Sequence, residues 1–285
     1  MKSLSLIFLI FLLFSCSKEP LQPWIANENT DQKLLVPLTF SGYKWTIKNS
    51  LPDRTGPGGN FFSKKPADVF VDASGYLHLA ITKTNNRWYC AEIWSNQNLG
   101  YGKYIYVTKG NVEQYDKKIV VGLFTWDDNT YQTQANDELD VEFAKWGNAN
   151  AQYVMAYSVQ PSFGFGVYPE RSITPQSHLV YDANGFTTHI IKWHTDRVTM
   201  EAHTGDDTTF ATLTHTWTFD NTNPPRKANE GGNPSDPVVI PVPGNTTKAH
   251  INFWLFDNNG DGKGDPPSNG LNEELVIKRF QFIPD

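Results

Sequence analysis

Short runs of apolar, β-branched and aromatic residues alternate along most of the chain with clusters of Asp, Asn, Gly and Ser. Such runs are typical of β-strands, and such clusters are typical of turns, as at residues 72–75, 127–129 and 182–185. No helical pattern extends over 12 or more residues. Many short strands at fairly even spacing predict an all-β sandwich or jelly roll. The predicted strands span residues 76–82, 104–108, 118–126, 152–159, 187–193, 197–203, 249–256 and 274–282.

One further segment of this kind carries acidic residues at alternate positions. Glu138, Asp140 and Glu142 share one face of an extended strand. The other face carries the apolar residues Leu139, Val141 and Phe143, which we expect in the core. Asp is depleted in strands, and like charges in a row repel each other. The acidic face is therefore either a solvated outer surface or a functional site, and the aromatic residues nearby favour a site.

The N-terminus has the features of an export signal. Lys2 precedes an apolar run over residues 4–14, which is too short to cross a bilayer as a helix. The run ends in Leu-Phe-Ser-Cys at Cys16, which resembles a bacterial lipobox, where the cysteine becomes the lipidated first residue. We expect a lipoprotein signal peptide at 1–15, a lipid-anchored flexible tether at 16–36, and an exported protein at the outer membrane or periplasmic face of the cell envelope. The alternative is an ordinary signal peptide and a secreted protein.

The composition excludes several classes of protein. The 285 residues are 14% aromatic and 19% charged, which argues against disorder and against a coiled coil. A net charge of −6 without a long Lys or Arg run argues against nucleic-acid binding. After signal cleavage at Cys16, Cys90 would be the single thiol of the chain and could form no internal disulfide. We interpret Cys90 as a buried, unreactive strand residue and expect a monomer.

Two segments interrupt the strand pattern. Residues 220–247 hold six prolines with many Asn and Gly, and a loop of this length either borders a ligand site or is a surface excursion. Residues 257–265 place oxygen-bearing side chains as in the start of a calcium loop, but the twelfth position is Ser268 and no helices flank it. This segment is either a structural calcium site or a polar turn. Its candidate ligands are Asp257, Asn259, Asp261 and Asp265.

Several motifs in the same order resemble glycoside hydrolase family 16, over roughly residues 37–285. The strand sequence Glu-x-Asp-x-Glu-Phe at 138–143 resembles the active-site signature of the family. Its surroundings resemble the family at 91–95 with 99–104 (the strand and Gly-Tyr-Gly turn), at 122–126, at 189–193 with 198–202, and at 252–254 (Asn-x-Trp). The resemblance implies one domain at 37–285, a jelly-roll sandwich of two curved antiparallel sheets, whose concave face holds a polysaccharide cleft.

The resemblance also implies a reaction and residue roles. Members hydrolyse or transfer internal β-glycosidic bonds with retention of configuration. By position, Glu138 matches the nucleophile, Glu142 the general acid/base and Asp140 the assisting carboxylate. The spacing in this chain is regular and lacks the extra residue of the family's bulged form. In the family, the regular form resembles lichenases and xyloglucan-active enzymes. The resemblance therefore implies a β-1,3-1,4-glucan or a related β-glucan as the substrate, cleaved without a required cofactor.

Candidate sugar-binding residues follow from the chemistry of pyranose rings, whose apolar C–H faces pack on aromatic rings. We expect two of four tryptophans to face the cleft, and Gln152 on the next strand is a candidate for a hydroxyl contact. The four tryptophans are Trp94, Trp126, Trp146 and Trp254. The histidines show no metal-type spacing with carboxylates, so we predict no zinc site. A catalytically silent glycan-binding lipoprotein on the same sandwich is the alternative function.

Overall fold

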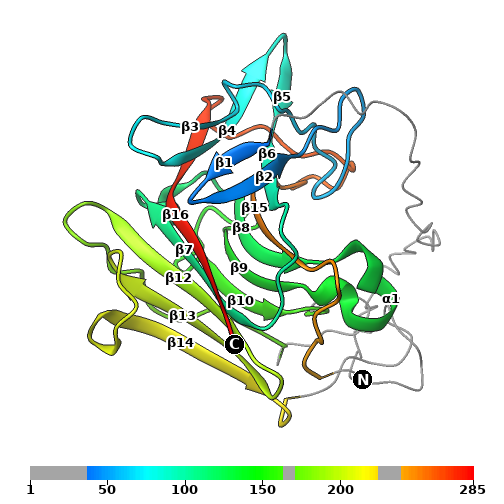
Figure 1. Ribbon diagram of the computed structural model, residues 1–285. Helices are drawn as coiled ribbons and strands as arrows, with labels where there is room; N and C mark the ends of the chain where they lie inside the picture. The colour runs from blue at the N-terminus through cyan, green and yellow to red at the C-terminus, as the bar shows by residue number, and fades with distance from the viewer. Residues whose placement is uncertain (1–36, 163–170, 224–238) are drawn as a thin grey trace, which may run out of the picture. The chain divides into compact units, whose positions relative to one another are not determined.

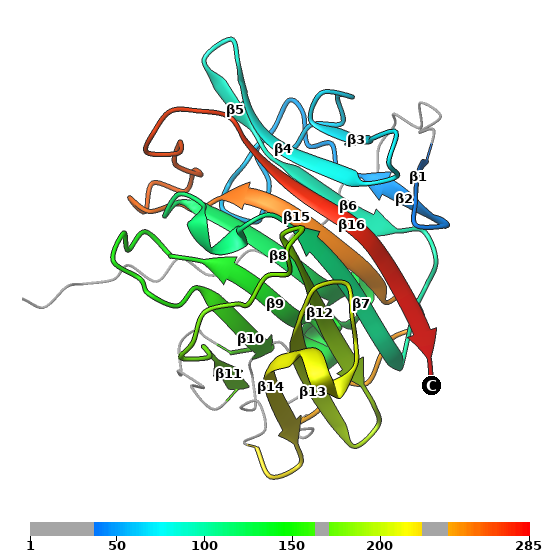
Figure 2. The ribbon, with the colours of Figure 1, turned by 90° about the vertical axis from the view of Figure 1, so that its left-hand side faces the viewer.

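The computed structural model describes residues 37–162, 171–223 and 239–285, which belong to one unit running from Val36 to Asp285. Cys16, the predicted signal peptide and the tether lie outside these residues. Two antiparallel sheets pack face to face (Figures 1 and 2), as predicted for a jelly roll. In order across the first sheet lie β1 (Leu38–Phe40), β2 (Tyr43–Ile47), β6 (Ala91–Ser95), β15 (Lys248–Leu255), β8 (Ile119–Trp126), β9 (Leu139–Ala144), β10 (Met155–Val159) and β11 (Ser172–Ile173).

The second sheet is built from the remaining strands. In order it contains β14 (Leu213–Asp220), β13 (Arg197–Thr204), β12 (Phe186–Trp193), β7 (Gly102–Lys109), β16 (Glu273–Pro284), β4 (Leu77–Thr84) and β3 (Val69–Val71), and β5 (Arg87–Tyr89) pairs with β4. The helices of the described residues are single turns: η1 (Val112–Gln114), η2 (Asp128–Thr130), α1 (Tyr131–Gln134), η3 (Ala135–Asp137) and η5 (Phe210–Thr212). None of these helices is long and apolar enough to span a bilayer.

The core lies between the sheets and follows the alternation in the sequence. Val141 of β9, Ile251 of β15 and Ile191 of β12 are fully buried there. The strand predicted at 152–159 begins later, at Met155, because its ladder with β9 starts at the pair Phe143–Met155. Strands β1, β2, β3, β5, β11 and β14 were not predicted, since they are short or rich in polar residues.

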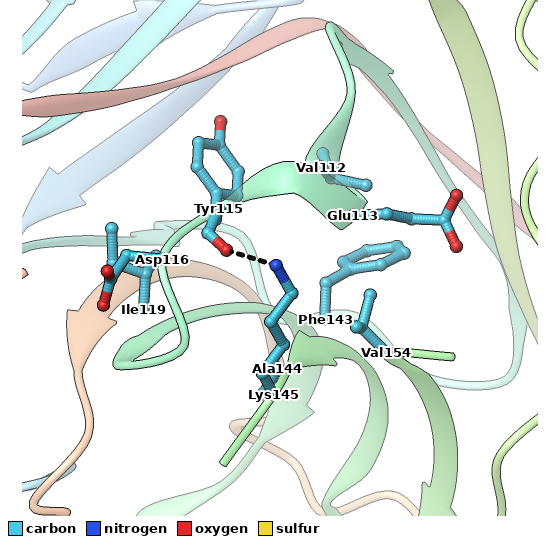
Figure 3. A pocket seen from close by; sticks show the side chains of 9 residues that line it. All are labelled: Val112, Glu113, Tyr115, Asp116, Ile119, Phe143, Ala144, Lys145 and Val154. Carbon is cyan, nitrogen blue, oxygen red and sulfur yellow. Dashed lines mark hydrogen bonds between the residues drawn. The ribbon is translucent and has the colours of Figure 1, made fainter. Parts of the chain in front are cut away.

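The end of the sandwich beside β9 is closed by η1. Val112 and Phe143 belong to the core cluster there. The Lys145 Nζ donates a hydrogen bond of 2.8 Å to the Tyr115 carbonyl oxygen, as Figure 3 shows. This contact ties the chain after β9 to the segment before β8, and so fixes the far end of the acidic strand.

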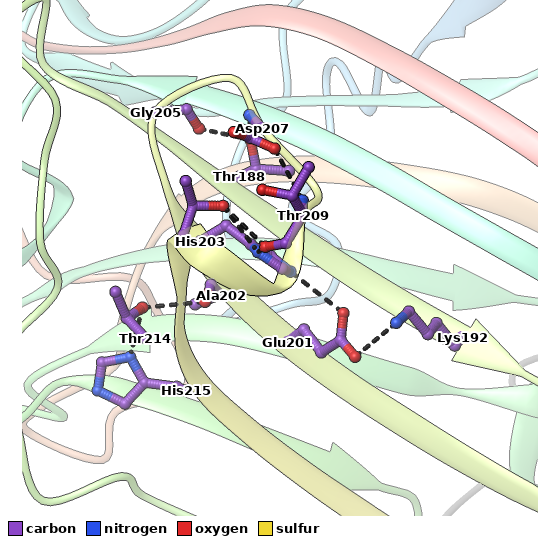
Figure 4. A network of polar contacts seen from close by, with 11 residues as sticks. Thr188, Lys192, Glu201, Ala202, His203, Gly205, Asp207, Thr209, Thr214 and His215 are labelled. Atoms are coloured by element: carbon purple, nitrogen blue, oxygen red, sulfur yellow. Dashed lines mark hydrogen bonds and ion pairs between the residues drawn. The ribbon is translucent and has the colours of Figure 1, made fainter.

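The outer face of the second sheet carries a polar network under the loop that contains η5. Lys192 Nζ donates to Glu201 Oε1 at 2.5 Å, and Glu201 Oε2 lies 3.1 Å from His203 Nε2 (Figure 4). The other ring nitrogen of His203 lies 3.1 Å from the Thr209 carbonyl oxygen. These buried groups therefore satisfy one another and hold this loop on the sheet.

Candidate active site

The three carboxylates predicted for the site lie together on β9 and the residue before it. Asp140 pairs with Phe124 of β8, and Glu142 pairs with Gly122 of the same strand. Directly paired residues of antiparallel strands point to the same side. Because Val141 and Phe143 point into the core, the carboxylates lie on the outer face of the first sheet. We call this surface the acidic face.

The carboxylates of the acidic face are sheltered from water although they point away from the core. Asp140 is only 3% exposed, and Glu138 and Glu142 are half-buried. Burial raises the pKa of Asp140 to about 7, even though hydrogen bonds with Gln160 and Glu138 lower it. Burial and then the charge of Asp140 raise the pKa values of Glu138 and Glu142 well above the usual value of 4.5. The cluster therefore retains protons at neutral pH, because its members cannot all ionise together.

Asp140 is oriented by Gln160, a residue that directly follows β10 and that sequence reasoning missed. The Gln160 Nε2 donates to Asp140 Oδ2 at 2.9 Å, and Gln160 Oε1 accepts from the Ser162 backbone N–H at 2.8 Å. The fully buried Arg171 donates to the carbonyl oxygens of Val159 and Gln160 at 3.2 and 3.0 Å. The chain at Gln160 is thus fixed on two sides, and its amide presents a donor to the carboxylate.

The backbone turns sharply just before Glu138. Ala135, Asn136 and Asp137 have φ values of 51°, 62° and 56°, in the left-handed region that costs energy for residues other than glycine. Thr125 Oγ1 donates to the Asp137 carbonyl oxygen at 2.5 Å and accepts from the Leu139 N–H at 3.1 Å. The turn returns the chain to an extended conformation at Glu138, with φ −79° and ψ 116°.

The described end of the long loop, residues 239–247, braces this turn. Asp137 Oδ2 accepts hydrogen bonds from the Gly244 N–H at 2.6 Å and from Thr247 Oγ1 at 2.8 Å. Asp127 Oδ1 accepts from Thr246 Oγ1 at 2.6 Å. The described end of the 220–247 segment therefore lies against the residues that lead into Glu138, and whether the segment borders a ligand site stays a prediction.

A cluster of polar side chains on β6 and β15, with Lys48 beside it, lies next to the acidic face. Lys48 Nζ lies 2.7 Å from Glu92 Oε2, and His250 Nδ1 lies 3.3 Å from Glu92 Oε1. Burial alone would raise the pKa of Glu92, but Lys48 and His250 hold it below its usual value. Asn252 pairs with Gly122 on one side and with Glu92 on the other. Its Oδ1 is buried over Gly122 and has no hydrogen-bond partner among the described residues.

The predicted tryptophans lie in different surroundings. Trp94 is half-buried and stacks on His250, with the ring centroids 5.8 Å apart. Trp126, two residues beyond Phe124 on the same face, is half-buried and donates from Nε1 to Asp128 Oδ1 at 2.7 Å. Trp254 is 8% exposed and contacts Trp146, which is 44% exposed. Gln152 is exposed in the bend before β10, and its sugar-contact role stays a prediction.

The other sequence expectations concern Cys90 and the 257–265 loop. Cys90 is free and fully buried, and burial raises the pKa of its thiol to about 12, as expected for an unreactive residue. Asp257 accepts backbone hydrogen bonds from Gly260 and Gly262. No cluster of three or more His, Cys, Asp and Glu side chains in the described part is arranged to hold a metal. Calcium binding by this loop stays a prediction.

Comparison with solved structures identifies the fold of this chain. No protein-family model and no curated protein matches the sequence. A β-glucanase of Bacillus licheniformis superposes with a TM-score of 0.53 and 20% identity, over 85% of this chain and 92% of that chain. A family 16 glycoside hydrolase of Bacteroides ovatus, in complex with a mixed-linkage glucan product, gives 0.53 and 16%, over 84% and 94%. A pseudo β-1,3-glucanase of Mycobacterium tuberculosis gives 0.56 and 14%, over 85% and 91%. The chain therefore has the jelly-roll fold of the family 16 glycoside hydrolases.

Proposed function

We propose that this protein is a retaining endo-β-glucanase of glycoside hydrolase family 16. The observation that carries the proposal is the set of three sheltered carboxylates, Glu138, Asp140 and Glu142, with raised pKa values on one face of β9. A retaining glycosidase needs one carboxylate as the nucleophile and one carboxylic acid as the proton donor. When such a cluster loses one of its shared protons, it holds a carboxylate beside a carboxylic acid, which is the combination that the reaction uses.

In the proposed reaction, Glu138 attacks the anomeric carbon while Glu142 gives its proton to the departing glycosidic oxygen. Water then enters with Glu142 as the base and releases the sugar from Glu138. Asp140 stands between them and exchanges a hydrogen bond with Glu138, so it adjusts the charge of the nucleophile.

The regular Glu-x-Asp-x-Glu spacing favours a mixed-linkage β-1,3-1,4-glucan or a related β-glucan as the substrate. Two solved structures of the same fold support this choice, a β-glucanase and an enzyme with a bound mixed-linkage glucan product. We propose Trp94 and Trp126 as sugar platforms, because both are half-buried on the acidic face. From the sequence we further propose export as a lipoprotein anchored at Cys16.

A panel of neutral polysaccharides with a reducing-sugar assay tests the proposal. We expect cleavage of mixed-linkage glucan, and a loss of about 10³-fold or more in Glu138→Gln. Glu273→Gln, which alters a carboxyl group of the second sheet, is the matched control and retains activity. Glu142→Gln should fail on the polysaccharide but still release dinitrophenolate from an activated glycoside, since that leaving group needs no proton. Binding without cleavage across the panel would contradict the proposal and favour a glycan-binding protein.

A further inference from the structure

A hollow of about 430 Å³ lies where three segments outside the acidic face meet. One is the chain around Arg54 and Phe61, the second is the hairpin between β4 and β5, and the third is the loop that precedes β16. Figure 2 shows that loop and β5 on the same side of the sandwich. None of the carboxylates proposed for catalysis lines the hollow. Its volume is within the range of small-ligand sites.

Two arginines are gathered on one aromatic ring at this hollow. The guanidinium carbons of Arg54 and Arg87 lie 4.2 and 4.3 Å from the ring centroid of Phe61. Cation–π contact favours each arginine separately, but two like charges held close together repel each other. Lys263 lines the same hollow. An anion bound here would relieve that repulsion, in a chain whose net charge is −6.

Neither arginine forms an ion pair in the part of the chain that the structure describes. Among the described residues, no carboxylate lies within ion-pair distance of Arg54 or Arg87, although Asp261 and Asp265 line the hollow. The Asp265 carboxylate instead accepts hydrogen bonds from the Asn258 N–H at 3.1 Å and from the Asn259 side-chain amide at 3.2 Å. Asp261 accepts a hydrogen bond from the Lys263 N–H at 3.0 Å and lies 3.9 Å from Lys263 Nζ, so this carboxylate offsets the lysine rather than the arginines. Arg54 donates to the Gly59 carbonyl oxygen at 2.7 Å, which orients it without cancelling its charge.

The remaining lining suits a sugar ring. Trp88 is half-buried and lines the hollow, and an indole ring packs on the apolar face of a pyranose. Asn86, at the tip of the β4–β5 hairpin, adds an amide that can bind hydroxyl groups. A guanidinium recognises a carboxylate or a sulfate through paired hydrogen bonds. An aromatic platform beside two arginines therefore combines the two requirements of an acidic sugar.

We propose that this hollow is a second carbohydrate site, which binds an acidic sugar residue of a polysaccharide through Arg54, Arg87 and Trp88. The acidic group is a carboxylate, as in a uronate, or a sulfate ester. Because this site shares no residue with the catalytic carboxylates, it would hold the enzyme on a charged glycan while the acidic face acts on a neutral one.

Isothermal titration calorimetry with the full chain tests the proposal. The probes are an oligouronate hexamer, a sulfated galactan hexamer and a neutral mixed-linkage glucan hexamer. We expect at least one acidic probe to bind, with an affinity that falls when the salt concentration rises. The variant R54Q/R87Q should weaken that binding at least tenfold. K103Q/R197Q, which removes the same charge from the second sheet, should not, and circular dichroism checks that both variants fold.

The two acidic probes separate the sources of the anion, because binding of the uronate alone assigns a carboxylate site and binding of the sulfated probe alone assigns a sulfate site. Trp88→Ala should weaken binding as well, whereas Glu138→Gln should leave it unchanged. This last comparison keeps the result independent of the proposed glucanase activity. The proposal is overturned if neither acidic probe binds, if R54Q/R87Q binds as tightly as wild type, or if the neutral hexamer displaces the acidic one from this site.

Discussion

Replacing Asp140 by Asn should make the protein more stable, and more so as the pH rises. Burial raises the pKa of Asp140 from its usual 3.8 to about 7 in the folded chain. Between these values the folded state binds a proton that the unfolded state has lost, so the stability of wild type falls as the pH increases. The difference corresponds to about 4 kcal/mol once the pH exceeds 7, at 1.36 kcal/mol for each pH unit.

The variant Asp140→Asn removes this cost and keeps the shape of the side chain. Its Oδ1 can still accept the hydrogen bond that Gln160 Nε2 donates at 2.9 Å. We therefore expect little difference from wild type at pH 4, and a gain that grows towards about 4 kcal/mol at pH 8. Urea denaturation followed by tryptophan fluorescence, at pH values from 4 to 8, measures this difference in the free energy of unfolding.

A control separates this effect from a general change in net charge. Asp196→Asn removes an exposed carboxylate that pairs with Arg197, so it should shift stability by a small amount that hardly depends on pH. If the gain of Asp140→Asn were the same at pH 4 and pH 8, or if the variant were less stable than wild type at pH 8, the electrostatic account of the acidic face would be refuted.

Four other variants test how the site is held. Gln160→Leu removes a hydrogen bond that lowers the pKa of Asp140, so the acid limb of the pH profile of kcat/KM should move to higher pH; an unchanged limb would exclude this role. Asp137→Ala loses two hydrogen bonds and should cost about 2–4 kcal/mol in urea denaturation. Asp137→Asn should cost less than about 1 kcal/mol, because Asn tolerates the left-handed region, and equal losses would contradict this reading. Gly122→Ala would place a Cβ 2.4 Å from Asn252 Oδ1 and displace that side chain, so kcat/KM should fall at least about tenfold while the fold persists. Unchanged kinetics would show that the position of Asn252 does not matter for the reaction.

The fold was predictable wherever alternation was strong. The acidic and apolar faces of β9 follow from the residue types alone, because a strand has a period of two and one face must be buried. Strand β14 escaped prediction, since its sequence LTHTWTFD carries polar residues at positions that pairing with β13 stabilises. Propensity alone does not report such tertiary pairing.

The supports of the site were less predictable than its carboxylates. Arg171 acts through hydrogen bonds to backbone carbonyl oxygens that tertiary packing brings together, among them those of Val159, Gln160 and Val239, and no local sequence pattern marks it. The left-handed residues Asn136 and Asp137 did offer a signal, since Asn and Asp enter that region most readily. Gln160 directly follows β10 and reaches Asp140, whereas sequence reasoning selected Gln152 because it expected the strand to begin there.

The central claim is that Glu138 and Glu142 act as a nucleophile and an acid/base pair. Proton NMR of the first product released from a mixed-linkage glucan tests it most directly, because the coupling constant of the anomeric proton identifies the initial anomer before mutarotation. The account predicts that the β-anomer appears first, since two displacements at one carbon retain configuration. An initial α-anomer would show a single displacement by water, and would contradict the role given to Glu138.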